Sequence, residues 1–331
     1  MKAIAPGKLI LSGEHSVVYG APAIAMAVTS TVTASYTPTE SPKLSISSDA
    51  FGGFSKNIAT FKFFSEQLDQ RFNLFLQRKL AVSDVLTSPS DLLFYTLSQL
   101  GFDRAGQISI ASDIPAGAGM GSSAAVIAAL LKLAEAFSQQ ELNKQEFFKL
   151  VRYCERLQHG CGSAIDAAAT TFGGVAKVQN DHVTLLPEYI GDNWFIWNSG
   201  TPKSSTGETV SAVRESFEFS TIWQHFEQVT QGFEQILPST DDQQKLALIQ
   251  ENQRLLQQIG IVPQAVADVI QCIELMGGSA KVCGAGSSSG DAGGLVLIYA
   301  PKGNAAEIAN SLNIHLQPLK ISYQGAHIES D

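Results

Sequence analysis

The sequence contains few charged residues, and basic residues are the scarcer of the two signs. Only 16% of its 331 residues are charged, against 44% apolar residues, so the chain is too apolar to remain disordered. Lys and Arg number 22 and Asp and Glu number 31, which gives a net charge of −9. A field of that sign repels nucleic acid and anionic membranes, so we expect neither as a partner.

The sequence also lacks the signals of export, membrane insertion and a structural metal site. Its N-terminal apolar run is interrupted by Pro6, Gly7 and Lys8, which leaves no signal-peptide core. Residues 16–39 carry no charge, but Gly, Pro and many Thr and Ser make them a poor membrane span. The four cysteines form no CxxC pair, which favours reduced, packed thiols over a zinc site. These absences predict a cytoplasmic protein.

Strand and helix patterns alternate along the chain and predict an α+β fold of two lobes. We expect an Ala-rich helix over 122–138 and a second helix after Asn143, where Glu146 completes a capping box. A shift in composition near residue 180 divides the chain into an N-terminal lobe (1–180) and a C-terminal lobe (181–331). The later strands are expected at 279–283, 293–299 and 319–328.

The strongest chemical signal is the run Ile114–Ala125, in which three glycines alternate with small residues before two serines. Glycine lets a backbone approach a ligand closely, and a helix N-terminus offers free N–H groups and the positive end of its dipole. The run therefore predicts a phosphate cradle, and the simpler alternative is a Gly-rich turn with a serine cap. It is not a P-loop, because no GxxxxGK(S/T) occurs in the chain, and it does not follow the first strand as a dinucleotide fingerprint would. The candidate phosphate-binding residues are Pro115, Ala116, Gly117, Ala118, Gly119, Met120, Gly121, Ser122 and Ser123.

Two further segments place isolated charged residues in apolar surroundings. Lys8 is the lone charge at the edge of an apolar strand, and Glu14 and His15 lie in the tight connection to the next strand. Taken alone, such residues are usually a solvated strand end and an exposed turn. Asp166 is the single charged residue of the stretch 160–176. It is either an ordinary charge at a helix N-terminus or a buried catalytic acid or base.

Taken in order, these segments resemble motifs of the GHMP kinase superfamily, named for its galactokinase, homoserine kinase, mevalonate kinase and phosphomevalonate kinase members. The runs Pro6–Gly20, Pro115–Ala125, 159–174 and Gly284–Gly294 carry the resemblance, which spans essentially the whole chain and is greatest to the mevalonate kinase family. The resemblance implies an N-terminal lobe like ribosomal protein S5 and a ferredoxin-like C-terminal lobe. The active site of the superfamily lies in the cleft between the two lobes.

The resemblance also implies a nucleotide and metal site. The loop 115–123 would wrap the phosphates of ATP. Ser123 and Glu155 are similar in position to the family's magnesium ligands, and a hydroxyl and a carboxylate suit a hard ion that keeps several waters. The late turn of Gly284, Ala285 and Gly286 would support the phosphate loop.

On the acceptor side, the resemblance implies four further roles. Asp166 is similar in position to the family's catalytic base and Lys8 to the lysine beside that base, while Glu14 and His15 match residues near the acceptor substrate. These roles agree with the chemistry of phosphoryl transfer, which needs positioning and charge neutralisation more than covalent catalysis. An alcohol is a poor nucleophile until a carboxylate accepts its proton, and a nearby ammonium keeps that carboxylate ionised.

The activity implied by the resemblance is the ATP-dependent phosphorylation of the 5-hydroxyl of mevalonate, which gives 5-phosphomevalonate and ADP in isoprenoid biosynthesis. ATP and mevalonate would be the ligands and Mg²⁺ the cofactor, and the family's precedent allows a homodimer.

Two departures from the mevalonate kinase pattern leave other acceptors open. Residues 162–166 read Gly-Ser-Ala-Ile-Asp instead of the usual Pro-Ser-Gly-x-Asp, and Ser287–Ser289 interrupt a run of glycines. The first departure and the dipeptide at 290–291 are similar to phosphomevalonate kinase, for which Lys203 would be the candidate cation for a substrate phosphate. The remaining alternatives are another small-alcohol kinase of the superfamily and, least favoured, a non-catalytic binding protein of the same fold.

Overall fold

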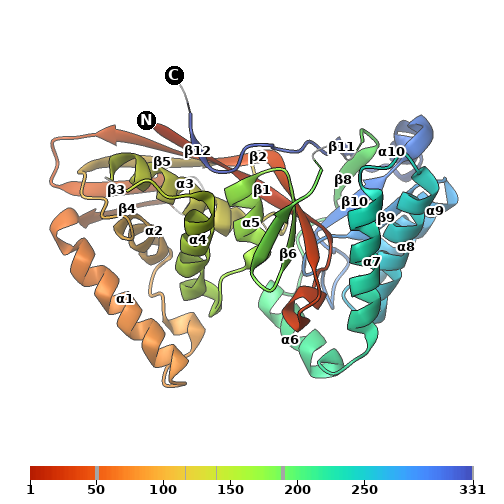
Figure 1. The fold of residues 1–331 in the computed structure, drawn as a ribbon, viewed down its shortest axis with the longest axis horizontal. Helices are drawn as coiled ribbons and strands as arrows, with labels where there is room; N and C mark the ends of the chain where they lie inside the picture. Colours follow the sequence, from red (N-terminus) through yellow and green to blue (C-terminus); the bar gives the residue numbers. More distant parts are fainter. Residues whose placement is uncertain (49–51, 116, 139, 188–190, 330–331) are drawn as a thin grey trace.

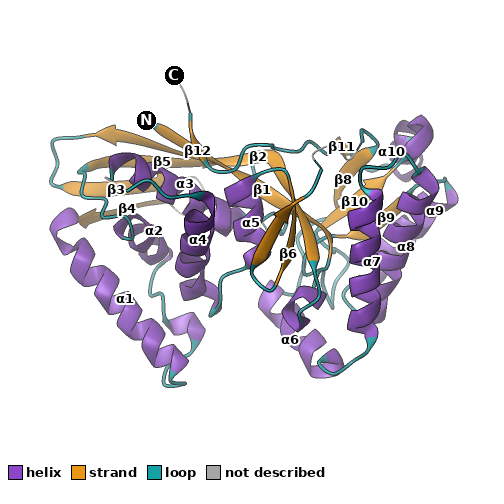
Figure 2. Ribbon diagram, viewed as in Figure 1, coloured by secondary structure: helices purple, strands orange, loops and turns teal. Residues whose placement is uncertain are grey.

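The computed structural model describes residues 1–48, 52–115, 117–138, 140–187 and 191–329, and Figures 1 and 2 show how their helices and strands are arranged. The strands are β1 (Lys2–Ser12), β2 (Ala23–Pro38), β3 (Lys43–Ser48), β4 (Gly52–Asn57), β5 (Gly106–Ser112), β6 (Val175–Gln179), β7 (His182–Leu185), β8 (Trp194–Asn198), β9 (Ser279–Val282), β10 (Leu295–Tyr299), β11 (Gln317–Pro318) and β12 (His327–Ile328). The α-helices are α1 (Phe61–Leu76), α2 (Pro89–Ser98), α3 (Ser122–Phe137), α4 (Lys144–His159), α5 (Ala164–Phe172), α6 (Thr206–Phe217), α7 (Ile222–Ile236), α8 (Asp242–Gln258), α9 (Gln264–Leu275) and α10 (Ala305–Leu312). Short 3-10 helices lie at Ser16–Tyr19, Ile58–Thr60, Val82–Asp84 and Pro301–Gly303.

The larger sheet has eight strands, six of them in the order β12-β1-β2-β5-β3-β4, and β2 is its longest member. The second half of β2 pairs with β5, and its first half pairs with β6, which in turn pairs with β7. All neighbours are antiparallel except β3 and β5. The long β2 therefore pairs with strands of two branches of the same sheet.

The pairing of β1 with β2 shifts register between Pro6 and Gly7. Proline has no N–H to donate to a strand ladder, so an irregularity at this residue is expected. Immediately after the shift, the backbone N–H of Lys8 donates to the carbonyl oxygen of Met120, at 2.8 Å. The irregularity thus joins the first strand to the Gly-rich loop.

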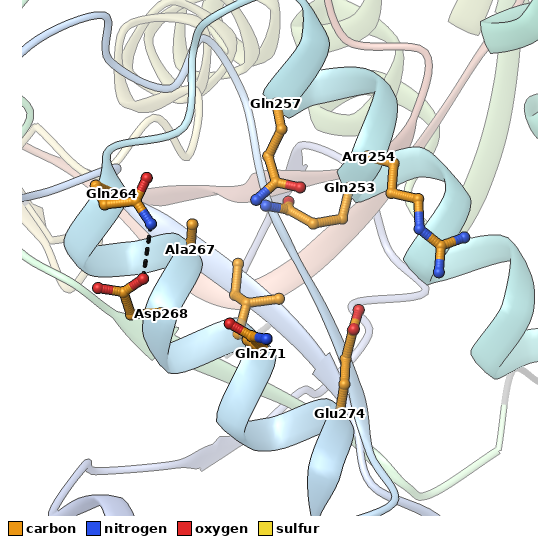
Figure 3. A pocket seen from close by; sticks show the side chains of 9 residues that line it. Gln253, Arg254, Gln257, Gln264, Ala267, Asp268, Gln271 and Glu274 are labelled. Atoms are coloured by element: carbon orange, nitrogen blue, oxygen red, sulfur yellow. Dashed lines mark hydrogen bonds between the residues drawn. The ribbon is translucent and has the colours of Figure 1, made fainter.

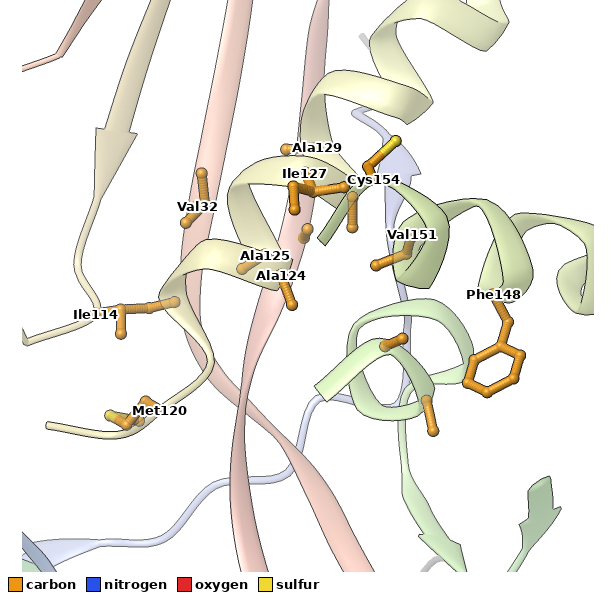
Figure 4. Close-up of a cluster of buried hydrophobic side chains, with 14 of the residues drawn as sticks. Val32, Ile114, Met120, Ala124, Ala125, Ile127, Ala129, Phe148, Val151 and Cys154 are labelled. Carbon is orange, nitrogen blue, oxygen red and sulfur yellow. The ribbon is translucent and has the colours of Figure 1, made fainter. Parts of the chain in front are cut away.

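Helix α3 packs on β1 and β2, and Figure 4 shows the small side chains that allow this close approach. Ala124, Ala125 and Ala129 are fully buried and hold the helix axis near the strands. On its other side α3 contacts α4, which contributes Val151 and Cys154 to the same cluster. Burying a large apolar side chain contributes about 1.5–3 kcal/mol, so this cluster stabilises the helix whose first turn follows the Gly-rich loop.

The smaller sheet has the order β11-β8-β10-β9 and is antiparallel throughout. Helices α9 and α10 bury one face of it in an apolar cluster, to which β9 contributes Ala280 and Val282. Helix α8 packs against β9 and β10 and also against α7. In the right-hand part of Figure 1, α7, α8, α9 and α10 lie beside the strands of this sheet.

Helix α7 attaches the part built around the smaller sheet to the larger sheet. The hydroxyls of Thr230 in α7 and Ser12 in β1 share a hydrogen bond of 2.7 Å, and both side chains are fully buried. The rings of Trp223 and Tyr19 stack with centroids 4.2 Å apart. These contacts fix α7 against the segment that follows β1.

The α+β architecture is confirmed, and so is the capping box at Asn143 and Glu146. The expected strand over 319–328 is wrong as a single element, because Leu319 bonds beside the smaller sheet whereas residues 320–322 bond to β2 of the larger sheet. Leu319 bonds to Trp194 beside the smaller sheet, whereas Ser322 bonds to Ala27 in the larger sheet. Only β12 at its end is a regular strand.

Chain segments beyond residue 180 belong to both sheets, since β7 and β12 lie in the larger sheet and β8 to β11 form the smaller one. The division into lobes 1–180 and 181–331 stays a prediction. In the described residues, no helix combines the length and apolarity needed to cross a membrane.

Candidate active site

The Gly-rich loop leads from β5 into the N-terminus of α3. Gly117, Gly119 and Gly121 all have positive φ, at 71°, 74° and 69°, a region that side chains other than glycine rarely adopt. Gly121 is the N-cap of α3, so no serine caps this helix and no side-chain hydrogen bond occupies its first N–H groups. The loop therefore presents backbone donors and the positive end of the helix dipole together. Of the predicted residues, Ala116 lies outside the described part of the chain.

Lys8 reaches from β1 to the loop and to Asp166. Its side chain is 7% exposed, and its ammonium donates to the carbonyl oxygen of Gly119 at 2.7 Å. The same nitrogen lies 3.2 Å from Oδ1 of Asp166. A Cβ added at Gly121 would lie 2.9 Å from Cγ of Lys8 and 3.3 Å from Oδ1 of Asp166, so the end of the loop packs directly on this ion pair.

Asp166 lies in the first turn of α5, where Ser163 is the N-cap and accepts a hydrogen bond from the backbone N–H of Asp166 at 3.2 Å. Asp166 is therefore a carboxylate at a helix N-terminus, which agrees with the simpler of the two interpretations. Its ion pair with Lys8 also agrees with a role as a catalytic acid or base. The side chain keeps 21% exposure, so the carboxylate is open to a ligand while it is paired.

Glu155 lies on α4, one helix away from Asp166, and its side chain is almost fully buried. Its Oε2 accepts a hydrogen bond of 2.8 Å from the backbone N–H of Ser163. Burial, and secondarily the charge of Asp166, raise the pKa of Glu155 above its usual range. Two carboxylates thus share a poorly solvated region in which a further positive charge would be stabilising.

Ser123 is in the first turn of α3, and its hydroxyl donates to Oε1 of Gln158 at 2.9 Å. Gln158 is on α4, three residues beyond Glu155. Ser123 and Glu155 therefore lie on neighbouring helices, a hydroxyl and a carboxylate of the kind that Mg²⁺ prefers. Among the described residues, no cluster of three or more His, Cys, Asp or Glu could hold a metal ion.

Glu14 and His15 lie in the turn after β1 and are both buried, not exposed as turn residues usually are. His15 has a positive φ of 57°, which is uncommon for a residue other than glycine. Its Nε2 lies 3.0 Å from the carbonyl oxygen of Ala285, and burial lowers the pKa of the ring, so His15 is neutral at neutral pH. The structure thus brings the predicted acceptor residues against the predicted late turn.

Glu14 forms an ion pair with Lys281 of β9, which the motif comparison of the sequence missed. A signal was available, because Lys281 is the lone charged residue between Gly277 and Gly290. A lysine within an apolar strand that leads into a Gly-rich turn is a candidate for a buried ion pair.

The late turn lies beside the phosphate loop. A Cβ at Gly284 would be 3.9 Å from the carbonyl oxygen of Gly119, and one at Gly286 would clash at 2.3 Å with the carbonyl oxygen of Ile261. The serines that follow do not disturb this packing, since the backbone N–H of Ser287 donates to Ile261. Lys203 is exposed and packs beside Gly290, outside the set of contacts that joins Lys8, Asp166 and the two turns.

A cavity of about 210 Å³ lies between α8 and α9 (Figure 3). Four glutamines, together with Arg254, Asp268 and Glu274, line most of it. The cavity contains none of the residues singled out above, so it is separate from the candidate active site. In its lining, Gln264 donates a hydrogen bond to Asp268 at 2.7 Å, and Oε1 of Gln253 accepts one from the backbone N–H of Val282 in β9.

A family model described as GHMP kinases N terminal domain matches residues 91–174. The matched segment runs from α2 through the Gly-rich loop to the end of α5, and it contains Ser123, Glu155 and Asp166.

The chain is also similar to whole proteins of this kind. A mevalonate kinase of Thermococcus sibiricus is 30% identical over 346 residues, covering 99% of this chain and 98% of that protein. A crystal structure of a mevalonate kinase has a TM-score of 0.81 at 22% identity, covering 98% of this chain and 100% of the other. The Methanococcus jannaschii mevalonate kinase has a TM-score of 0.79 at 23% identity, covering 97% and 98%. At these identities the structural likeness shows a shared fold.

Proposed function

The chain belongs to the mevalonate kinase family of the GHMP kinase superfamily, and we propose that it phosphorylates the 5-hydroxyl of mevalonate with ATP. The products are 5-phosphomevalonate and ADP, an early phosphorylation in isoprenoid biosynthesis. The proposal rests on the family membership for the acceptor. For the chemistry it rests on one observation, the ion pair of Lys8 and Asp166 packed against the end of the Gly-rich loop.

Asp166 acts as the general base in this proposal. Its carboxylate accepts the proton of the 5-hydroxyl as the oxygen of that hydroxyl bonds to the γ-phosphorus, and the bond from the γ-phosphorus to the bridging oxygen breaks to release ADP. Lys8 lies 3.2 Å from the carboxylate, so its positive charge faces the base directly. Lys8 also donates a hydrogen bond to the carbonyl oxygen of Gly119, so a single side chain contacts both the base and the phosphate loop.

The Gly-rich loop binds the phosphates of ATP. Its glycines let backbone N–H groups face the ligand, and the N-terminus of α3 adds a favourable dipole without a capping side chain in the way. These local donors bind an anion despite the net charge of −9. The turn Gly284–Gly286 supports the loop from the side of Gly119.

Ser123 and Glu155 fit a magnesium site by their chemistry and surroundings. Glu155 is a buried carboxylate whose pKa is raised by burial and by Asp166, so a divalent cation there would remove an unfavourable pairing of charges. Ser123 adds a hydroxyl on the neighbouring helix, and water and substrate phosphates would complete the coordination. When bound, Mg²⁺ neutralises charge on the phosphates of ATP.

Glu14 and His15 contact the acceptor alcohol in this proposal. We further propose that the enzyme is cytoplasmic, that its cysteines are reduced, and that the chain divides into two lobes at residue 180. The unpaired thiols Cys154 and Cys283, which are buried, support the reduced state.

The test is ATP turnover by the purified protein with Mg²⁺, offering mevalonate and 5-phosphomevalonate in parallel and identifying the products by ³¹P NMR. We expect a phosphomonoester signal from mevalonate and no turnover of 5-phosphomevalonate. Turnover of 5-phosphomevalonate alone would overturn the proposal in favour of phosphomevalonate kinase and would make Lys203 the next residue to replace. No turnover of either acceptor, with ATP still bound, would exclude both.

A further inference from the structure

The segment between β8 and α6 is neither helix nor strand, and it lies against the Gly-rich loop. We name this segment, residues 199–204, the strap. A Cβ added at Gly117 would be 3.4 Å from Cγ2 of Thr201, so the strap contacts the first of the three positive-φ glycines. A Cβ added at Gly119 would meet nothing within 4 Å. Thr201 is therefore a boundary on one side of a loop that otherwise borders open space.

The first end of the strap is held by the segment that enters β10. The hydroxyl of Ser199 donates to the carbonyl oxygen of Gly294 at 2.7 Å and accepts from the backbone N–H of Gly293 at 3.0 Å. Gly294 also borders the Gly-rich loop, since a Cβ there would lie 3.4 Å from the ring of Pro202 and 3.9 Å from the carbonyl oxygen of Ala118. The strap, the start of β10 and the loop thus meet at one point.

The second end of the strap is held by the three serines that interrupt the glycines after the late turn. The hydroxyl of Ser204 shares hydrogen bonds with those of Ser288 and Ser289, at 3.2 and 2.9 Å. The backbone N–H of Ser204 donates to Oγ of Ser287 at 3.3 Å, and that hydroxyl donates to the carbonyl oxygen of Ser289 at 2.7 Å. Ser287 is only 1% exposed, so water does not compete for these bonds. Glycines at these positions would supply no hydroxyl to this end of the strap.

A loop with several glycines is costly to order, because glycine loses more conformational freedom than any other residue. A loop that is restrained before its ligand arrives binds that ligand more tightly, since less entropy is lost on binding. The strap supplies such a restraint at Gly117, and the late turn supplies one at the carbonyl oxygen of Gly119. Loosening the strap should therefore weaken the binding of a ligand to the loop.

We propose that Ser204 and Ser287 are positioning residues for the nucleotide, which hold the strap against the Gly-rich loop and so pre-organise the loop for the phosphates of ATP. This inference rests on the proposed function for the identity of the ligand. The hydroxyls of the two serines bond to the strap and to the segment after the late turn, whereas Lys8 pairs with Asp166 beside Gly121. Removing either hydroxyl therefore leaves the proposed base and its ion pair intact.

The experiment compares Ser204→Ala and Ser287→Ala with Ser239→Ala. Ser239 is a matched control because its hydroxyl also accepts a backbone N–H, that of Asp241 at 3.0 Å, but in the turn between α7 and α8. Calorimetric titration in the presence of Mg²⁺ gives the Kd for ATP, and steady-state kinetics give the KM for each substrate. For both strap variants we expect the Kd and KM for ATP to rise about threefold to tenfold, the range for one lost hydrogen bond. The KM for mevalonate and kcat at saturating ATP should stay within about twofold.

The difference between the two substrates separates positioning from stability. A variant that is merely less stable loses active protein, which lowers the apparent kcat and leaves both KM values unchanged. An unchanged Kd for ATP in both strap variants would overturn the inference, as would a similar rise in Ser239→Ala or an equal rise in the KM for ATP and for mevalonate. ATP binding without phosphorylation of mevalonate would refute the proposed acceptor alone, because the calorimetric Kd needs no acceptor. Wild-type protein that binds no ATP would refute the proposed function and this inference with it.

Discussion

Replacing Asp166 with asparagine removes the proposed base and preserves nearly everything around it. Asparagine has the same shape, and the cap of α5 uses the backbone N–H of residue 166, which the substitution leaves intact. The ion pair with Lys8 is lost, but so is the repulsion that Asp166 exerts on buried Glu155. We therefore expect Asp166→Asn to fold and to melt within a few degrees of the wild-type protein.

The effect on catalysis is large. General-base catalysis contributes about 10²–10⁴-fold, so kcat with mevalonate should fall by that factor, which corresponds to about 3–5 kcal/mol in the activation free energy. The phosphate donors of the Gly-rich loop and of α3 are unchanged, so the KM for ATP should stay within about threefold. This division between kcat and KM identifies a group that acts in the transition state.

The assay is steady-state ADP release measured with both substrates varied, alongside calorimetric titration of ATP. Asp181→Asn is the matched control, since Asp181 also pairs with an arginine or lysine, in this case Arg152, but has a side chain that is 65% exposed. The control should retain wild-type kcat. A loss of less than about tenfold in Asp166→Asn, or a loss confined to the KM for ATP, would refute the assignment of Asp166 as the base.

Three other outcomes follow from packing and burial. Gly162→Ala places a Cβ 2.2 Å from the backbone oxygen of Arg152 and should lower the free energy of unfolding by about 1–3 kcal/mol. The control Gly207→Ala, on α6, adds a Cβ in open space and should not lower the free energy of unfolding. Equal melting temperatures for the two variants would contradict this prediction. As the pH falls from about 7 to 5, His15 contributes a loss of native-state stability, because burial lowers the pKa of its ring and the unfolded chain then binds more protons, whereas Glu155, whose pKa is raised, contributes the opposite trend. In urea titrations the stability of His15→Asn relative to the wild-type protein should therefore rise as the pH falls over this range, and a constant difference would refute the contribution of His15. A thiol reagent should label the exposed Cys161 and Cys272 in the native protein and all four cysteines after unfolding. Burial raises the pKa of the Cys154 thiol to about 12 and that of the Cys283 thiol to about 11, so labelling of Cys154 or Cys283 in the native protein would contradict the structure.

The local elements of the site were predictable from the sequence. The Gly-rich run before an Ala-rich helix predicted a close-approaching loop at a helix N-terminus, and the structure has such a loop, with positive φ at its three glycines, leading into α3. Asn143 and Glu146 predicted the start of α4 because a capping box involves only residues three apart. Such signals are readable because the interactions that produce them join near neighbours in the chain. The expected strand over 319–328 shows the limit, since its residues bond to two sheets that no local pattern can identify.

The contacts between distant residues were decided by the tertiary structure alone. Composition and spacing marked Lys8 and Asp166 as isolated charges, but a solvated strand end and a helix charge fitted the sequence equally well. The pairing of β1 with β2, and the packing of α3 and α5 on both, bring the two side chains within 3.2 Å. Lys281 lies 267 residues from Glu14, and only the seating of β9 against the turn after β1 shows that they meet. A buried ion pair leaves no periodic signal in the sequence, because each partner is a single residue whose environment is assembled from other parts of the chain.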